Sequence, residues 1–79
     1  MERNNTKKKK ILKHLGINIK FYRKKLNLTQ EQVAEQIGAE RSYITALESG
    51  SKSPSIYFLY ELSQALNTTL KELMDIKIN

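Results

Sequence analysis

The chain contains no cysteine, a single histidine, and only one proline and three glycines among its 79 residues. Without cysteine it cannot form disulfides or a thiolate metal site, and His14 alone cannot build a histidine-based zinc site. No apolar run approaches the roughly 20 residues of a membrane-spanning helix. The basic N-terminal stretch is followed by short apolar runs that Lys interrupts, unlike a signal peptide. We therefore expect a cytoplasmic domain that uses no metal, cofactor, small-molecule ligand or membrane.

The short length predicts one small domain, because a chain of this size barely supports a single hydrophobic core. Such a core leaves little room for a water-excluded catalytic pocket. Glu31 and Glu35 have i and i+4 spacing on an expected solvent-facing helix surface, and His14 has no carboxylate nearby in the sequence. The chain is therefore not expected to be an enzyme.

Charge is distributed unevenly along the chain. Residues 1–25 contain ten Lys and Arg and one acid, a net charge of +9, whereas residues 26–79 contain four basic and seven acidic residues, a net charge of −3. A basic segment of this kind favours a polyanionic partner, nucleic acid before a membrane surface. A solubilising tail is the alternative that charge alone leaves open.

Apolar residues at helical spacing predict helices over about 16–26, 30–37, 41–49, 56–66 and 70–73. The first is expected to start near Gly16, because glycine inside a helix costs about 1 kcal/mol relative to alanine. Polar residues 1–10 lack the pattern and predict a disordered basic arm, followed by a helical domain over 11–74 and a tail over 75–79. The residues expected to face the core are Leu12, Leu15, Ile19, Tyr22, Leu26, Val33, Ala34, Ile37, Ile44, Leu47, Ile56, Leu59, Leu62, Ser63, Leu66, Leu70 and Leu73.

The segment from residue 29 to residue 50 carries the most specific local signals. Thr29 and Gln32 have the spacing of a capping box that opens a helix, and Gly38 follows the last apolar residue of that helix, where a left-handed C-cap is expected. Small Ala34 permits a second helix to cross closely. These are the geometric requirements of a helix-turn-helix, although a generic helical hairpin shares them. Ser55, and Thr69 with Glu72, predict two further helix caps.

Two stretches of the sequence, "LTQEQVAEQIGAERSYITALESG" and "SPSIYFLYELSQALNTTLKELM", resemble the helix-turn-helix family of phage Cro proteins and lambda-type repressors, the XRE-like transcriptional regulators. The resemblance covers about residues 17–74. Within the family, the segment 41–48 looks most like restriction–modification controller proteins, and the Pro-Ser-Ile helix start looks like small repressors of Gram-positive bacteria. The resemblance implies an all-α, compact five-helix domain that binds double-stranded DNA, acts as a nucleoid-associated repressor or controller, and occupies an inverted repeat as a homodimer.

By this resemblance the helix over 41–49 is the recognition helix, which reads bases in the major groove. The implied base-reading residues are Arg41, Ser42, Tyr43, Thr45 and Ala46. Arg41 is the sharpest candidate, since its guanidinium matches guanine O6 and N7. The alternatives are a solvated Arg41, a Ser42 that only supports the helix start, and a Tyr43 half-buried against the helix over 30–37.

Backbone phosphate contacts are expected on either side of the recognition helix. The family places one at Gln30, and the loop after the recognition helix is expected to supply others. The Lys run is expected to act as an arm on the DNA backbone or in the minor groove. The full set of expected phosphate contacts is Gln30, Lys52, Ser53, Ser55, Lys7, Lys8, Lys9 and Lys10. An ordinary polar loop is the alternative for the serines.

Two further features concern anchoring and fit to DNA. In related repressors an Arg and a Glu at the positions of Arg23 and Glu48 form an ion pair that anchors the recognition helix. Glu40 departs from the family pattern, because it takes the N-cap position where Ser or Thr is commoner and would repel a nearby phosphate. The net negative charge of residues 26–79 is also unusual for a DNA-binding half.

Apolar residues left outside the core are candidates for a dimer interface. Met74, Ile76 and Ile78 alternate with polar residues and predict a short strand that pairs across the dimer axis. The expected interface residues are Leu70, Met74, Ile76, Ile78 and Tyr57. A protein-interaction module, either an antitoxin-like subunit or a repressor held by an antagonist protein, is the alternative function, and RNA polymerase is a further candidate partner of a regulator.

Overall fold

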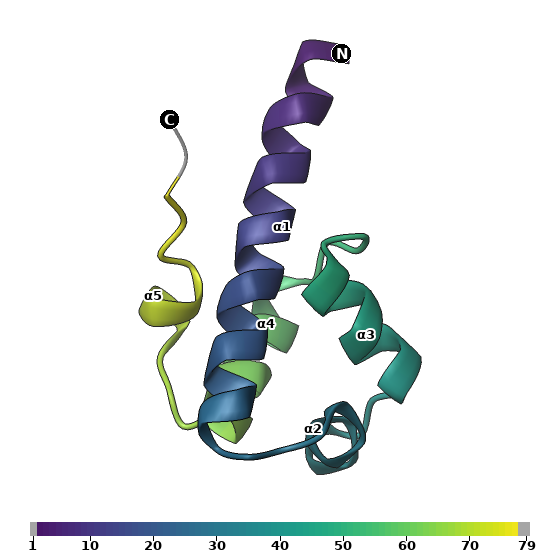
Figure 1. Cartoon of the computed structure of the whole chain (residues 1–79), viewed down its shortest axis with the longest axis vertical. Coiled ribbons are helices and arrows are strands. Elements are labelled where there is room, and N and C mark those ends of the chain that lie inside the picture. The colour runs from purple at the N-terminus through teal and green to yellow at the C-terminus, as the bar shows by residue number, and fades with distance from the viewer. Residues whose placement is uncertain (1, 78–79) are drawn as a thin grey trace.

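The computed structural model describes residues 2–77, and describes side chains from residue 5 onward. Five helices make up this part of the chain: α1 (Glu2–Lys25), α2 (Gln30–Ile37), α3 (Arg41–Ser49), α4 (Ile56–Ala65) and α5 (Leu70–Leu73). The long α1 stands at the centre, with α2 and α3 on one side of it and α5 on the other (Figure 1). Between residues 2 and 77 there is no strand, and no helix is both long and apolar enough to cross a membrane. The predicted all-α, five-helix architecture is confirmed.

Every helix contributes to one hydrophobic core, in which apolar side chains are shielded from water on all sides. The predicted apolar pattern is confirmed at most positions. Leu26 and Ile56 are exceptions, because their side chains are 38% and 65% exposed. Leu26 lies just beyond the end of α1, on a hollow that Leu66 and Glu72 also line, and Ile56 is the first residue of α4. The buried core comprises Leu15, Ile19, Val33, Ala34, Ile44, Leu47, Leu59, Leu62, Leu66 and Leu73.

The first helix is much longer than the sequence predicts. Residues 2–10, expected to be a disordered arm, continue α1 as a helix that projects beyond the body of the domain (Figure 1). Lysine is a good helix former, and adding residues to an existing helix is far easier than nucleating one. The packed part of α1 after residue 10 therefore extends as a helix into the preceding residues, although these lack the apolar pattern that would form a helix on its own.

Gly16 lies in the middle of α1, so the expected helix start at this residue is wrong. A Cβ atom at Gly16 would overlap the carbonyl oxygen of Glu48 and would lie 2.6 Å from that of Leu47. Glycine is therefore required because α1 and the last turn of α3 cross at backbone contact.

Local capping signals are confirmed around α2. The Thr29 hydroxyl accepts from the Gln32 amide, the Gln32 side chain accepts from the Thr29 amide, and Gly38 ends the helix with φ +69°. The Ser55 hydroxyl caps α4 by accepting from the Phe58 amide.

The caps of α3 and α5 are less regular. Glu40 occupies the N-cap of α3 without a side-chain hydrogen bond to the helix. Thr69 caps α5 by accepting from the Glu72 amide, but the Glu72 carboxylate accepts from the Thr68 hydroxyl, so the predicted second capping box is only half formed.

The predicted C-terminal strand is absent from the residues that the structure describes, because residues 74–77 instead fold back along α1. The Asn18 side-chain amide donates to the carbonyls of Leu73 and Asp75 at 2.9 and 3.2 Å, and the Lys77 amide donates to His14 Nδ1 at 3.2 Å. These bonds satisfy backbone groups that a strand would offer to a partner. Ile78 lies outside the described residues.

Candidate nucleic-acid interface

One face of α3 is polar and open to solvent. Ile44 and Leu47 anchor the opposite face in the core. Helical periodicity places residues three and four positions apart on the same side, so the open face forms a stripe along the helix. The exposed residues of α3 are Arg41, Ser42, Thr45 and Ser49, and Ala46 beside them is partly exposed.

Tyr43 is directed away from this stripe. Its ring packs edge-to-face on Phe58 of α4, with 5.0 Å between ring centroids and 82° between planes. The side chain is partly buried against the core, as the alternative for Tyr43 predicts, but its aromatic partner lies on α4 and not on α2, where that alternative placed it. Its ring therefore helps to fix α3 on α4.

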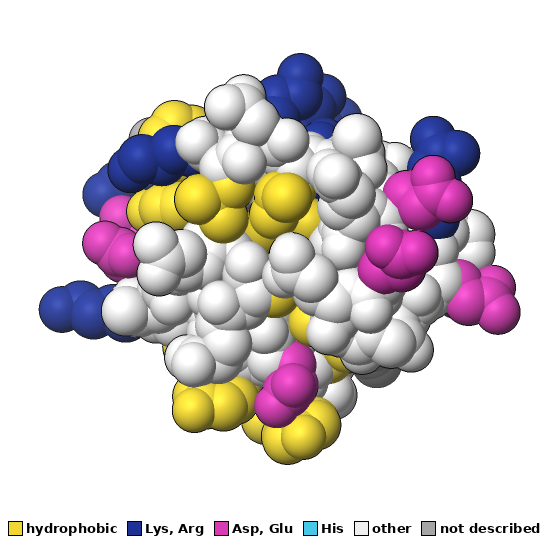
Figure 2. Space-filling view, turned by 90° about the horizontal axis from the view of Figure 1, so that it is seen from below, with side chains coloured by type: hydrophobic (Ala, Val, Ile, Leu, Met, Phe, Trp, Pro, Cys, Tyr) yellow, Lys and Arg dark blue, Asp and Glu magenta, His cyan; other side chains and the backbone are white. Residues whose placement is uncertain are grey.

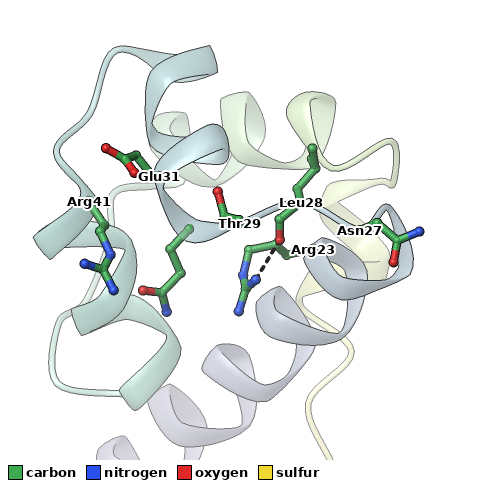
Figure 3. A pocket seen from close by; sticks show the side chains of 7 residues that line it. Arg23, Asn27, Leu28, Thr29, Glu31 and Arg41 are labelled. Atoms are coloured by element: carbon green, nitrogen blue, oxygen red, sulfur yellow. Dashed lines mark hydrogen bonds between the residues drawn. The ribbon is translucent and has the colours of Figure 1, made fainter.

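A hollow of about 550 Å³ opens where the end of α1 and the starts of α2 and α3 meet. Figure 3 shows Arg41 and Arg23 reaching toward the same side of it from α3 and α1. Arg41 is exposed, whereas Arg23 is buried. The first residues of α2 border the same hollow, and the free amides of a helix N-terminus attract anions. The hollow is lined by Arg23, Asn27, Leu28, Thr29, Gln30, Glu31 and Arg41.

A buried ion pair joins the end of α1 to the last turn of α3. Arg23 donates from Nε and Nη2 to the two carboxylate oxygens of Glu48 at 2.6 and 3.0 Å, and from Nη1 to the Leu28 carbonyl at 2.7 Å. The Arg23 and Glu48 side chains are only 10% and 5% exposed. The hydrogen bond to Glu48 raises the pKa of Arg23 above its ordinary value, against the opposing effect of burial. The pairing that the family resemblance implies is therefore present and hydrogen-bonded on both oxygens.

Gln30 connects this ion pair to the exposed face of α3. Its amide nitrogen donates to Glu48 Oε1 at 3.0 Å, and its amide oxygen accepts from the Thr45 hydroxyl at 2.7 Å. Sequence reasoning expected Gln30 at a phosphate and Thr45 at a base, and missed the link between them. The spacing of 15 positions offers no local signal for this contact.

At the other end of α3, residues far apart in sequence come together. Lys7 and Lys8 of α1 line a hollow of about 350 Å³ together with Ser53 of the loop after α3. Lys52 is exposed in the same loop, and the Ser55 hydroxyl is occupied as a helix cap. The structure thus brings Lys7 and Lys8 of the arm beside Ser53 of the loop, which their separation in sequence did not indicate.

Acidic side chains border the other end of this surface. Glu31, Glu35 and Glu40 are all exposed on α2 and the turn before α3. Figure 2, which views the molecule from below, shows several acidic side chains on the side of α2 and α3, and Lys and Arg side chains along the upper rim and at the left. Favourable potential for a polyanion therefore comes from Arg41 and from the end of the surface near the arm.

Comparisons with known proteins agree with this arrangement. Residues 19–73 match the helix-turn-helix family HTH_3. An uncharacterised HTH-type transcriptional regulator of Sinorhizobium fredii is 39% identical over 62 residues, covering 78% of this chain and 80% of the relative. Control protein C.SmaI of Serratia marcescens is 38% identical over 60 residues, covering 76% and 71%.

A solved structure shares the fold as well. The restriction-modification controller protein C.AhdI from Aeromonas hydrophila has a TM-score of 0.76 and 31% identity, covering 78% of this chain and 94% of its own. These relatives are regulators, and the family is not enzymatic, as predicted from the sequence. The chain belongs to the HTH_3 helix-turn-helix family of DNA-binding, XRE-type transcriptional regulators.

Proposed function

We propose that this chain is a sequence-specific regulator that places α3 in the major groove of double-stranded DNA and binds an inverted-repeat operator as a homodimer. The observation that carries the proposal is the open polar face of α3, which is anchored from behind by the core and by the buried Arg23–Glu48 pair. A recognition helix needs this combination, because base contacts give discrimination only when the helix that bears them is held rigidly. Occupation of an operator by such a dimer blocks or recruits RNA polymerase.

Base reading is assigned to the exposed residues of α3. Arg41 begins the helix and carries donors only, so it suits the O6 and N7 acceptors of guanine. Thr45 lies one turn further along the same face, and Ser42 and Ala46 lie beside it. The packing of Tyr43 on Phe58 supports a role for Tyr43 in orienting α3 rather than in reading a base.

Phosphate contacts are assigned to both ends of α3. Gln30 and the first-turn amides of α2 border one end, where a helix N-terminus favours an anion. Lys52 and Ser53, with Lys7 and Lys8 close to Ser53, border the other. Because three acids are exposed at the first end, affinity depends chiefly on Arg41 and on the second end.

Homodimer formation is assigned to α4, α5 and the segment that follows α5. Tyr57 and Tyr60 on α4 and Met74 just after α5 are exposed at 69%, 50% and 39%, and Leu70 and Ile76 are partly buried. Exposed apolar side chains of this kind favour association. A two-fold dimer predicts half-sites with centres about 34–36 Å apart.

Selection of bound duplexes from a random DNA pool, with wild type and Arg41→Ala side by side, tests this function. The wild type is expected to select an inverted repeat that contains a guanine in each half-site. Arg41→Ala is expected to lose that guanine preference, a discrimination worth roughly 1–3 kcal/mol. Lys20→Ala on α1 is the matched control, because it removes one exposed positive charge that is assigned neither to DNA nor to the dimer contact, and it should leave the motif unchanged.

Each other outcome of this selection has a definite meaning. A guanine that survives Arg41→Ala contradicts the assignment of Arg41 but keeps the function. Binding that selects no motif and disappears at moderate salt contradicts sequence-specific regulation. No binding at all by the folded protein favours a role in holding a protein partner.

The contribution of the arm is measured by the salt dependence of operator binding. Replacing Lys7, Lys8, Lys9 and Lys10 with Gln removes four charges while keeping residues that favour a helix. The slope of log K against log salt is expected to fall by about 0.9 for each phosphate that the variant no longer neutralises. Lys20→Gln with Lys24→Gln is the control, since both are exposed lysines of α1 that are assigned neither to DNA nor to the dimer contact. An unchanged slope in the arm variant shows that the Lys run does not touch DNA.

A further inference from the structure

The buried ion pair determines which atoms of Gln30 face which neighbours. Arg23 offers only donors, and its two nitrogens bind the two oxygens of Glu48, so Glu48 is a carboxylate that only accepts. The Gln30 side chain lies 3.0 Å from Glu48 Oε1. Only the amide nitrogen of Gln30 can make that contact, because a carbonyl oxygen in the same place would face a second acceptor.

The same reasoning fixes the hydroxyl of Thr45. With its nitrogen toward Glu48, Gln30 presents its oxygen to Thr45 Oγ1 at 2.7 Å. A hydroxyl has one proton and two lone pairs, so Thr45 must donate its proton to Gln30. The outward side of Thr45 then offers lone pairs and a methyl group, but no donor.

We propose that Gln30 is a positioning residue that turns Thr45 into a pure acceptor, so that α3 selects a base with an exocyclic amino group at the position Thr45 reads. In the major groove adenine N6 and cytosine N4 are donors, whereas guanine O6 and thymine O4 are acceptors. Arg41, one turn earlier, has the opposite character because it only donates. This inference rests on the proposed placement of α3 in the major groove. It goes further by naming the class of base that Thr45 selects next to the guanine read by Arg41.

Selection from a random duplex pool tests the inference with wild type, Thr45→Val and Gln30→Ala. The wild type is expected to prefer adenine or cytosine over guanine or thymine by about fivefold or more at one position of the half-site. Thr45→Val, which removes the hydroxyl at nearly constant shape, should lose that preference and keep the guanine read by Arg41. Gln30→Ala releases the Thr45 proton, so the hydroxyl can rotate and donate, and all four bases should be accepted there within about twofold.

Two comparisons separate this effect from a weaker hold on phosphate or a weakened fold. A missing phosphate contact lowers affinity for every sequence alike, whereas the expected change is confined to one base position. Gln30→Met provides a second variant without an amide, and Gln36→Ala, at an exposed glutamine of α2, is the matched control. Circular dichroism of each variant verifies that it is folded.

The outcomes distinguish the two levels of the proposal. The inference is overturned if the preference for an amino base persists in Thr45→Val, or if it is unchanged in both folded Gln30 variants. In either case the proposed function still stands as long as the rest of the operator motif is selected. A wild-type preference for guanine or thymine at the position that Thr45→Val alters also overturns the inference. If the wild type selects no motif, the proposed function itself is overturned.

Discussion

Glu48→Ala is expected to lower the free energy of unfolding by about 3–5 kcal/mol, the usual cost of breaking a buried ion pair from one side. The substitution leaves the Arg23 guanidinium buried, with the Leu28 carbonyl as its remaining acceptor. It also removes the acceptor of the Gln30 amide. Urea unfolding followed by circular dichroism measures the loss, without DNA present.

Matched variants show whether the lost stability comes from an unpaired charge. Glu35→Ala removes an exposed acid of α2 and should change stability by no more than about 0.5 kcal/mol. Replacing both partners, as Arg23→Met with Glu48→Leu, removes the buried charge and should recover part of the loss. A Glu48→Ala protein within about 0.5 kcal/mol of wild type contradicts the anchoring role.

Arg23 does not make the stability of the fold depend on pH near neutrality. Its pKa is raised in the folded protein, and a raised pKa contributes stability that is fully present below the unfolded value and is lost only as pH rises through the folded value. For an arginine both values lie far above neutral pH. The guanidinium therefore stays charged over the whole range in which the fold is measured.

Local features of the helix-turn-helix could be predicted from the sequence because their causes lie within a few residues. Thr29 and Gln32 satisfy each other's backbone amides across three positions, and Gly38 supplies a left-handed φ at a fixed distance from the end of α2. Helical periodicity likewise placed Ile44 and Leu47 in the core. These signals identified α2 and α3 with their observed bounds.

Features that depend on contacts between distant segments could not be predicted in this way. Gln30 and Thr45 meet where α2 packs against α3, and Gln30 also binds Glu48 of the ion pair. The tail is held by the Asn18 side chain, 55 positions from Leu73, so its alternating pattern misleadingly predicted a strand. The family resemblance supplied the Arg23–Glu48 pair, which spacing alone does not indicate.

Gly16→Ala is expected to lower the free energy of unfolding by about 3 kcal/mol, at the upper end of the usual cost of overpacking. Helix propensity by itself predicts the opposite, a gain of about 1 kcal/mol for removing a glycine from the interior of a helix. The tertiary contact should prevail because the new methyl group would overlap the carbonyl oxygen of Glu48 and would lie 2.6 Å from that of Leu47. Both are backbone atoms, so α1 and α3 must move apart to accept it.

Gly38→Ala is the control that separates this clash from a general cost of replacing glycine. A Cβ atom at Gly38 meets nothing within 4 Å, but the residue has a positive φ of 69°, so its replacement should cost only about 1–2 kcal/mol. Urea unfolding of both variants gives the comparison. A Gly16→Ala protein more stable than wild type contradicts close backbone contact at this crossing. A loss of stability larger than that of Gly38→Ala supports close backbone contact between α1 and α3. Separating these helices at Gly16 should also loosen the Arg23–Glu48 pair. Glu48 takes part in both contacts, because its carbonyl packs against Gly16 and its carboxylate binds Arg23.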